Sequence, residues 1–229
     1  MTDYKNLKLI ATSNPHIRSN DTTRSIMLDV IIAMLPALIW SVVEFGVRAI
    51  AVTLVSVAGS VFFEWLYRNI LKKPQSVGDL SAVVTGMLLA FVCPVNMPYW
   101  MILVGDFFAI VVVKMPFGGT GRNVFNPAAA GMAVVTHCFS TRLFLYPDPS
   151  LNAPLALSGD LGKALTEMSP AAQLAGGGSP TYSWAELAIG RFPGPIGATC
   201  IAVLAACALY LFTRRTASPL ITLSFLAVC

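Results

Sequence analysis

Residues 116–131 read Pro-Phe-Gly-Gly-Thr-Gly-Arg-Asn-Val-Phe-Asn-Pro-Ala-Ala-Ala-Gly and lie between two strongly apolar segments. Three closely spaced glycines let the backbone adopt left-handed conformations or approach another group closely; they are Gly118, Gly119 and Gly121. The polar side chains of the stretch need hydrogen-bond partners in apolar surroundings; they are Arg122, Asn123 and Asn126. Polar, irregular backbone beside a membrane segment normally lines a cavity or holds a ligand. A tight turn in which Pro127 starts the next helix explains the same residues equally well.

The composition of the chain identifies a membrane protein. Of 229 residues, 56% are hydrophobic and 11% are charged, whereas soluble domains average about 25% charged residues. The net charge of +4 is spread over short loops, so it indicates membrane topology and gives no sign of a nucleic-acid surface. We therefore predict an all-α, polytopic membrane protein.

Apolar segments of about 20 residues or somewhat less follow one another along the chain, and each is a candidate membrane crossing. They cover residues 26–43, 47–66, 80–92, 99–113, 126–139 and 196–212, and a further one starts after Pro219. This pattern predicts about six complete transmembrane helices and the start of a seventh. Since that last apolar run is too short to span a membrane, we expect the natural protein to continue beyond this sequence.

Basic residues assign the sides of the membrane by the positive-inside rule. Residues 1–25 form a basic, cytoplasmic N-terminal arm, and residues 26–139 form a first transmembrane bundle that contains loop 116–131. Lys114 and Arg122 fit a cytoplasmic position for this loop. Residues 140–191 form a long extracytoplasmic loop rich in Pro, Gly and Ser, and residues 192–229 hold the further transmembrane helices.

The chain resembles the D subunit of the Rnf ferredoxin:NAD oxidoreductase complex and the related B subunit of the sodium-pumping NADH:quinone oxidoreductase. The resemblance runs through residues 13–18, 27–36, 79–89 and 98–100, and is strongest at Gly-Gly-Thr-Gly-Arg-Asn-Val-Phe-Asn-Pro-Ala-Ala, residues 118–129. It covers nearly the whole chain in the order of the family.

The resemblance implies a flavin-holding electron carrier in the bacterial cytoplasmic membrane, with a cytoplasmic N-terminus and a helical bundle similar to urea and ammonium transporters. Its partners are membrane lipid and the other membrane and peripheral subunits of a complex that moves Na+ or H+. It also implies a noncovalent riboflavin held by the asparagine pair, here Asn123 and Asn126. Carboxamides can pair with both edges of an isoalloxazine, and the neighbouring glycines let backbone amides approach the flat ring.

The family attaches a second flavin, FMN, to a threonine in the outer loop. The matching stretch here is Thr-Glu-Met-Ser-Pro-Ala-Ala-Gln-Leu, residues 166–174, in which Ala172 occupies the acceptor position. Alanine has no hydroxyl to form a phosphoester. The expectation is therefore that covalent FMN is absent, that Ser169 or Thr166 accepts it, or that the flavin is held noncovalently.

Asp106 is the clearest acid inside an apolar segment, and an ion-pathway or cofactor-facing role stands beside that of a hydrogen-bonded structural acid. Asp29 and Glu44 have interfacial explanations, because they lie near segment ends. The histidines are isolated, so we expect no metal site, and no nucleophile or phosphate-loop motif supports hydrolytic chemistry. The alternatives to a flavin carrier are a small-solute channel and a scaffold protein without flavin.

Overall fold

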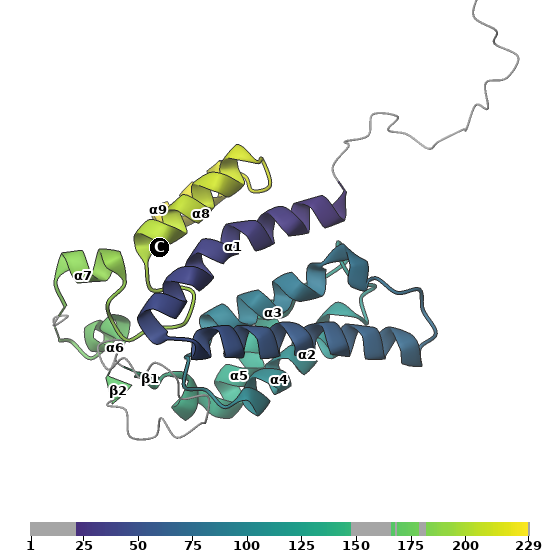
Figure 1. Ribbon diagram of the computed structural model, residues 1–229, viewed down its shortest axis with the longest axis horizontal. Coiled ribbons are helices and arrows are strands. Elements are labelled where there is room, and N and C mark those ends of the chain that lie inside the picture. The colour runs from purple at the N-terminus through teal and green to yellow at the C-terminus, as the bar shows by residue number, and fades with distance from the viewer. Residues whose placement is uncertain (1–21, 148–165, 168, 179–181, 229) are drawn as a thin grey trace, which may run out of the picture.

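A computed structural model describes residues 22–147, 166–167, 169–178 and 182–228 of the chain. Nearly all of the N-terminal arm, with its family-like stretch 13–18, lies outside the described residues. So does much of the expected outer loop, including residues 148–165. Within the described part, helices account for most of the structure (Figure 1). This agrees with the prediction of an all-α protein, while the number of membrane crossings stays a prediction.

Two long helices form the first hairpin of the bundle. α1 spans Thr23–Phe45 and α2 spans Arg48–Ile70. Both are long and apolar enough to cross a membrane, and they are the described helices that meet this test at 18 residues or more. The chain reverses at Gly46, whose φ of 78° lies in the region that favours glycine.

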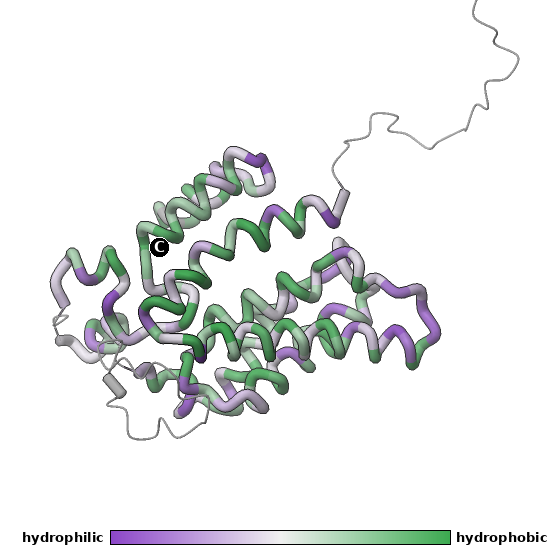
Figure 2. The backbone as a smooth tube through the Cα atoms, in the orientation of Figure 1, coloured by the Kyte–Doolittle hydropathy of each residue, from purple (hydrophilic) through white to green (hydrophobic). Residues whose placement is uncertain are grey.

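The core of the bundle is completed by three further elements, with a short 3-10 turn, η2 (Val77–Asp79), before them. α3 spans Ser81–Val92, and α4 (Tyr99–Phe107) continues directly into a π-helix, η3 (Phe108–Lys114). α5 spans Pro127–Leu143 and is kinked at Phe139. Figure 2 shows that hydrophobic residues run along these helices, whereas hydrophilic residues gather in the connection after α2.

Small residues bring the core helices close together. A Cβ atom on Gly86 of α3 would lie 2.8 Å from the Ser56 carbonyl oxygen of α2. A Cβ atom on Gly131 of α5 would lie 2.6 Å from the Gly105 carbonyl oxygen of α4. Such contacts are shorter than van der Waals packing allows, so glycine at these positions sets the spacing of the backbones.

The last complete apolar segment is helical over a shorter range than the sequence predicts. α8 spans Ile201–Thr213, so residues 196–200 are not part of the helix. The reason is that this stretch pairs with the end of α3: the Ile196 amide donates to the Cys93 carbonyl oxygen at 3.1 Å, and the Gly197 amide donates to that of Phe91 at 2.9 Å. Gly197-Ala198-Thr199 therefore precedes the helix, which corrects the start of the predicted segment 196–212.

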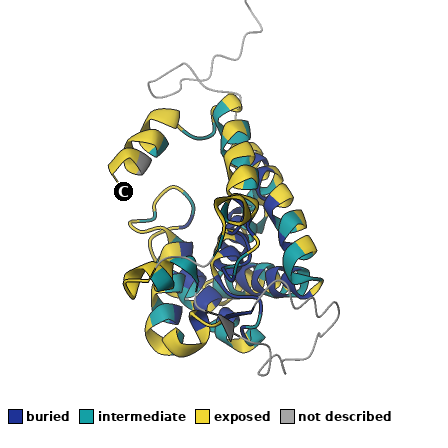
Figure 3. Ribbon diagram, turned by 90° about the vertical axis from the view of Figure 1, so that its left-hand side faces the viewer, coloured by how far each residue is buried: buried dark blue, intermediate teal, exposed yellow. Residues whose placement is uncertain are grey.

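The remaining elements are short. β1 (Tyr146–Pro147) pairs antiparallel with β2 (Thr166–Glu167), followed by α6 (Pro170–Ala175) and α7 (Trp184–Ile189). α6 ends at Ala175, and Gly176 is its C-cap. α9 (Pro219–Val228) follows α8, and Figure 3 shows both helices largely exposed beside the buried core. Arg214 at the end of α8 pairs with Asp29 of α1 at 3.0 Å.

Candidate functional site

Loop 116–131 begins at the end of η3 and leads into α5, and its glycines have the backbone conformation that the sequence predicts. The φ angles of Gly118, Gly119 and Gly121 are 107°, 89° and 85°. A residue with a side chain adopts such values only with strain. A Cβ atom on Gly121 would meet nothing within 4 Å, so the backbone there is open on that side.

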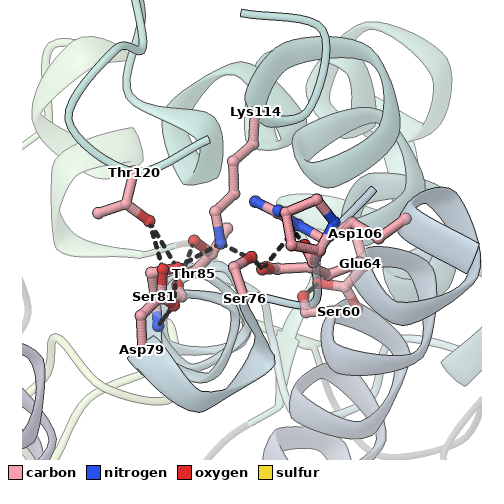
Figure 4. A network of polar contacts seen from close by, with 11 residues as sticks. Ser60, Glu64, Ser76, Asp79, Ser81, Thr85, Asp106, Lys114 and Thr120 are labelled. Atoms are coloured by element: carbon pink, nitrogen blue, oxygen red, sulfur yellow. Dashed lines mark hydrogen bonds and ion pairs between the residues drawn. The ribbon is translucent and has the colours of Figure 1, made fainter. Parts of the chain in front are cut away.

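Beneath this loop lies a buried ion pair that joins three elements. The Lys114 Nζ atom donates to Glu64 Oε2 of α2 and to Ser81 Oγ of α3, each at 2.6 Å (Figure 4). Lys114 is 1% exposed and Glu64 is fully buried. Ser76 also donates to Glu64, and the Arg68 side chain lies 3.9 Å from it. The carboxylate therefore has partners on both oxygens, as a buried charge requires.

The loop is fastened to this ion pair through a second group of polar residues. The Thr120 hydroxyl lies 2.8 Å from Ser81 Oγ and 3.0 Å from Asp79 Oδ2. Asp79 Oδ1 accepts from the Ser81 amide and hydroxyl at 2.9 and 2.6 Å. We call Glu64, Asp79, Ser81, Lys114 and Thr120 the anchoring network (Figure 4).

Both asparagines of the predicted pair shape the loop itself. With its amide nitrogen turned inward, the Asn123 side chain donates to the carbonyl oxygens of Lys114 and Gly119, at 3.3 and 3.1 Å. Asn126 caps α5, because its Oδ1 atom accepts from the Ala128 amide at 3.1 Å. The structure thus contains the tight turn and the helix start at Pro127 that one of the two interpretations of the sequence predicts.

Apolar and charged side chains project from the outer side of the loop. Val124 and Phe125 are 65% and 64% exposed, and Phe117 and Arg122 are also exposed. Arg122 lies across the backbone of the loop, since a Cβ atom on Gly118 would be 3.2 Å from its Cδ atom. This outer side combines aromatic rings, a guanidinium group and open glycine backbone.

The second predicted flavin stretch lies at the other end of α5. β1 follows α5 at its carboxyl end, and β2, which contains Thr166, pairs with it (Figure 1). Ser169 caps α6, because its hydroxyl oxygen accepts from the Ala172 amide at 3.3 Å. The structure therefore separates Thr166 and Ser169 from loop 116–131 by the length of a helix. Among the described residues, no three His, Cys, Asp or Glu side chains gather as a metal site.

The anchoring network is not predicted from the sequence. There Lys114 indicates only the cytoplasmic side, and no pattern pairs it with Glu64. One available signal is the spacing of Ser56, Ser60 and Glu64, four residues apart on α2, which places three polar groups on one face of an apolar helix.

Comparison with known proteins identifies the family of the chain. Residues 10–229 match the family described as NQR2, RnfD, RnfE. The chain belongs to this family. This membership confirms the resemblance noted from residues 118–129.

The curated relatives are D subunits of ion-translocating complexes. The chain is 46% identical over 164 residues to the D subunit of the Na(+)-translocating ferredoxin:NAD(+) oxidoreductase complex of Acetobacterium woodii, covering 68% of this chain and 52% of the relative. It is 29% identical to the D subunit of the proton-translocating complex of Clostridium ljungdahlii, covering 92% and 64%. It is 32% identical to the D subunit of the ion-translocating oxidoreductase complex of Rhodobacter capsulatus, covering 93% and 66%. The matches thus span 52% to 66% of the length of these relatives.

Proposed function

We propose that this protein is a flavin-binding, electron-transferring membrane component of an Rnf-type complex, and that loop 116–131 holds a noncovalent riboflavin. The observation that carries the proposal is a glycine loop fixed from beneath by a buried ion pair and presenting aromatic and cationic side chains outward. The family membership and the names of the curated relatives support the placement in such a complex.

The residues of the outer side fit an isoalloxazine. Phe117 and Phe125 offer flat apolar surfaces for the ring, and the open backbone at Gly121 allows close approach. The Asn126 oxygen is used by the helix cap, which leaves the amide nitrogen to donate to a flavin carbonyl. When bound, the flavin supplies the one- and two-electron chemistry, and the chain binds, orients and shields it.

In the proposed function, the anchoring network holds the flavin-binding loop in place. A ring that exchanges electrons works best in a site whose geometry is fixed before binding. Thr120 ties the loop to α3 through Ser81 and to η2 through Asp79, while Lys114 ties its start to α2 through Glu64. The loop is thereby held on two helices of the bundle.

Asn126→Asp in the complete complex tests the flavin site. Aspartate keeps the capping oxygen for Ala128 but removes the amide donor, so α5 stays capped while the riboflavin content falls. The measurement is flavin extracted per polypeptide, and Asn69→Asp at the exposed end of α2 is the matched control. A wild-type complex without riboflavin, or an unchanged content in Asn126→Asp, contradicts the proposal.

Covalent FMN is a separate question, because Ala172 stands where the family has its acceptor threonine. We expect no covalent flavin at residue 172, and Ser169 and Thr166 are the candidate acceptors nearest to it in sequence. Fluorescence of the denatured polypeptide in a gel measures covalent flavin directly. A fluorescent band that disappears in Thr166→Ala or Ser169→Ala identifies the acceptor, whereas a dark band leaves the noncovalent site as the flavin site of the described chain.

The coupled ion is not determined by similarity, since one relative is named for Na(+) and another for proton translocation. Electron transfer by the complex in proteoliposomes, with and without Na+ and with a protonophore, distinguishes the two. Dependence on Na+ that survives the protonophore assigns Na+ transport.

A further inference from the structure

Asp106 lies in the core of the bundle and is not part of the anchoring network. It belongs to α4, is 0% exposed and faces α2. Both of its polar contacts reach the same oxygen: Ser56 Oγ lies 2.9 Å and Ser60 Oγ lies 2.8 Å from Asp106 Oδ1. The Ser60 contact is visible in Figure 4.

Ser56 and Ser60 have too few hydroxyl protons for all the hydrogen bonds around Asp106. Ser56 Oγ also lies 2.8 Å from the Gly86 carbonyl oxygen of α3. There are thus three hydrogen-bond contacts, but each serine hydroxyl has one proton to donate and a carbonyl oxygen can only accept. An ionised Asp106 leaves one contact without a hydrogen of its own. A protonated Asp106 supplies the third hydrogen.

The other carboxyl oxygen points to the same protonation state. Asp106 Oδ2 is buried and has no hydrogen-bond partner among the described residues. It lies over α2, since a Cβ atom on Gly59 would be 3.3 Å from it. A bare oxygen sharing a full negative charge is costly in such a place, whereas the carbonyl oxygen of a neutral acid is tolerated far better.

We propose that Asp106 is a proton-binding site inside the helix bundle, a neutral carboxylic acid in a chain of hydrogen bonds that runs from Ser60 through Asp106 to Ser56 and the Gly86 carbonyl. In this chain Ser60 donates to Asp106 Oδ1, the Oδ1 hydroxyl donates to Ser56, and Ser56 donates to Gly86. Every contact then has one hydrogen, and Oδ2 is the carbonyl oxygen. The site does not depend on flavin binding.

None of the other ionisable groups described around the site competes with Asp106 for this proton. On α2, Glu64 is one turn beyond Ser60 and is already paired with Lys114 from η3. At the end of α3, Cys93 is a buried free thiol. The buried residues of α5 carry no charge: Ala128, Gly131, Val135 and Leu143.

Infrared difference spectroscopy of the complete complex at neutral pH, wild type against Asp106→Asn, reads the protonation state directly. The proposal expects loss of one carboxylic-acid carbonyl band, a band that shifts on exchange into D2O. Loss of a pair of carboxylate bands overturns it. Asp29→Asn is the matched control, because Asp29 is paired with Arg214 and its replacement gives the carboxylate signature.

Two further variants keep the test decisive where Asp106→Asn does not assemble. Asp106→Glu retains the acid and moves the same carbonyl band, and Ser60→Ala removes one donor to Oδ1 and shifts the band without abolishing it. An acid band indifferent to both variants belongs to another residue and overturns the proposal.

Discussion

Lys114 and Glu64 place opposite charges in the interior of the bundle. The protein tolerates these buried charges because they are paired. Lys114 has its second hydrogen bond on Ser81, so the ion pair also fixes the start of α3. Two charges removed from water cost several kcal/mol each unless they meet partners of good geometry. Removing one partner therefore does more damage than removing both.

We expect Lys114→Met to destabilise the protein by about 3–5 kcal/mol, because it leaves the Glu64 carboxylate buried without its cation. The double variant Glu64→Gln/Lys114→Met should recover much of this loss. Thermal unfolding of the purified complex in detergent measures both, and Lys73→Met, at an exposed position, is the control. Equal losses in the single and double variants contradict the ion-pair explanation.

The left-handed glycines of the loop cannot carry a side chain without strain. Gly119→Ala introduces a side chain at φ 89° and brings its Cβ to 3.1 Å from the Arg68 Nη2 atom, which costs about 1–2 kcal/mol in backbone conformation alone. Riboflavin content should fall, since the loop must change shape. Gly78→Ala, which has open space and no positive φ, should leave flavin unchanged. Similar flavin content in both variants argues against a site at the loop.

At the scale of elements, close packing of α4 against α5 sets the position of the loop between them. Gly131 lies one turn into α5, and the Gly105 carbonyl blocks any side chain there at 2.6 Å. Since α4 leads into loop 116–131 through η3 and α5 follows the loop, a change in the spacing of α4 and α5 moves the loop as well.

Gly131→Ala should therefore destabilise the protein by about 1–3 kcal/mol and lower its riboflavin content together. The matched control is Gly176→Ala after α6, where the nearest atom would be at an ordinary 3.5 Å. Melting temperature and extracted flavin are the two measurements. A Gly131→Ala protein with normal values of both means that the helices separate without cost, contrary to the packing seen here.

For the whole molecule, the arrangement of α5 predicts that its two ends open to opposite sides of the membrane. Loop 116–131 precedes α5, and the paired β1 and β2 with α6 follow it (Figure 1). The positive-inside pattern predicts a cytoplasmic position for the loop. In a background without native cysteines, Gly121→Cys should react with a membrane-impermeant maleimide only from the cytoplasmic side, and Ala172→Cys only from outside. Labelling of both from one side would overturn this topology.

Helices α8 and α9 expose apolar side chains at their surface. Leu209, Leu220, Ile221 and Phe225 are exposed on these helices. Figure 3 shows the C-terminal helix α9 as largely exposed. Exposed apolar residues of this kind are expected where lipid or another protein covers the surface.

The sequence alone determined the helical class, the bounds of α1 and α2 to within a few residues, and the loop with its three left-handed glycines. These features depend on local composition, because apolar length and glycine conformation act within a few residues of the chain. Only the tertiary structure decided that Lys114 meets Glu64 and that Asp106 meets Ser56 and Ser60. It also decided that Ile196 and Gly197 bond to the end of α3, so that α8 begins later than the apolar segment. Each of these contacts joins residues 46 or more positions apart, and the partner of a buried polar group is chosen by helix packing, which no short stretch of sequence specifies.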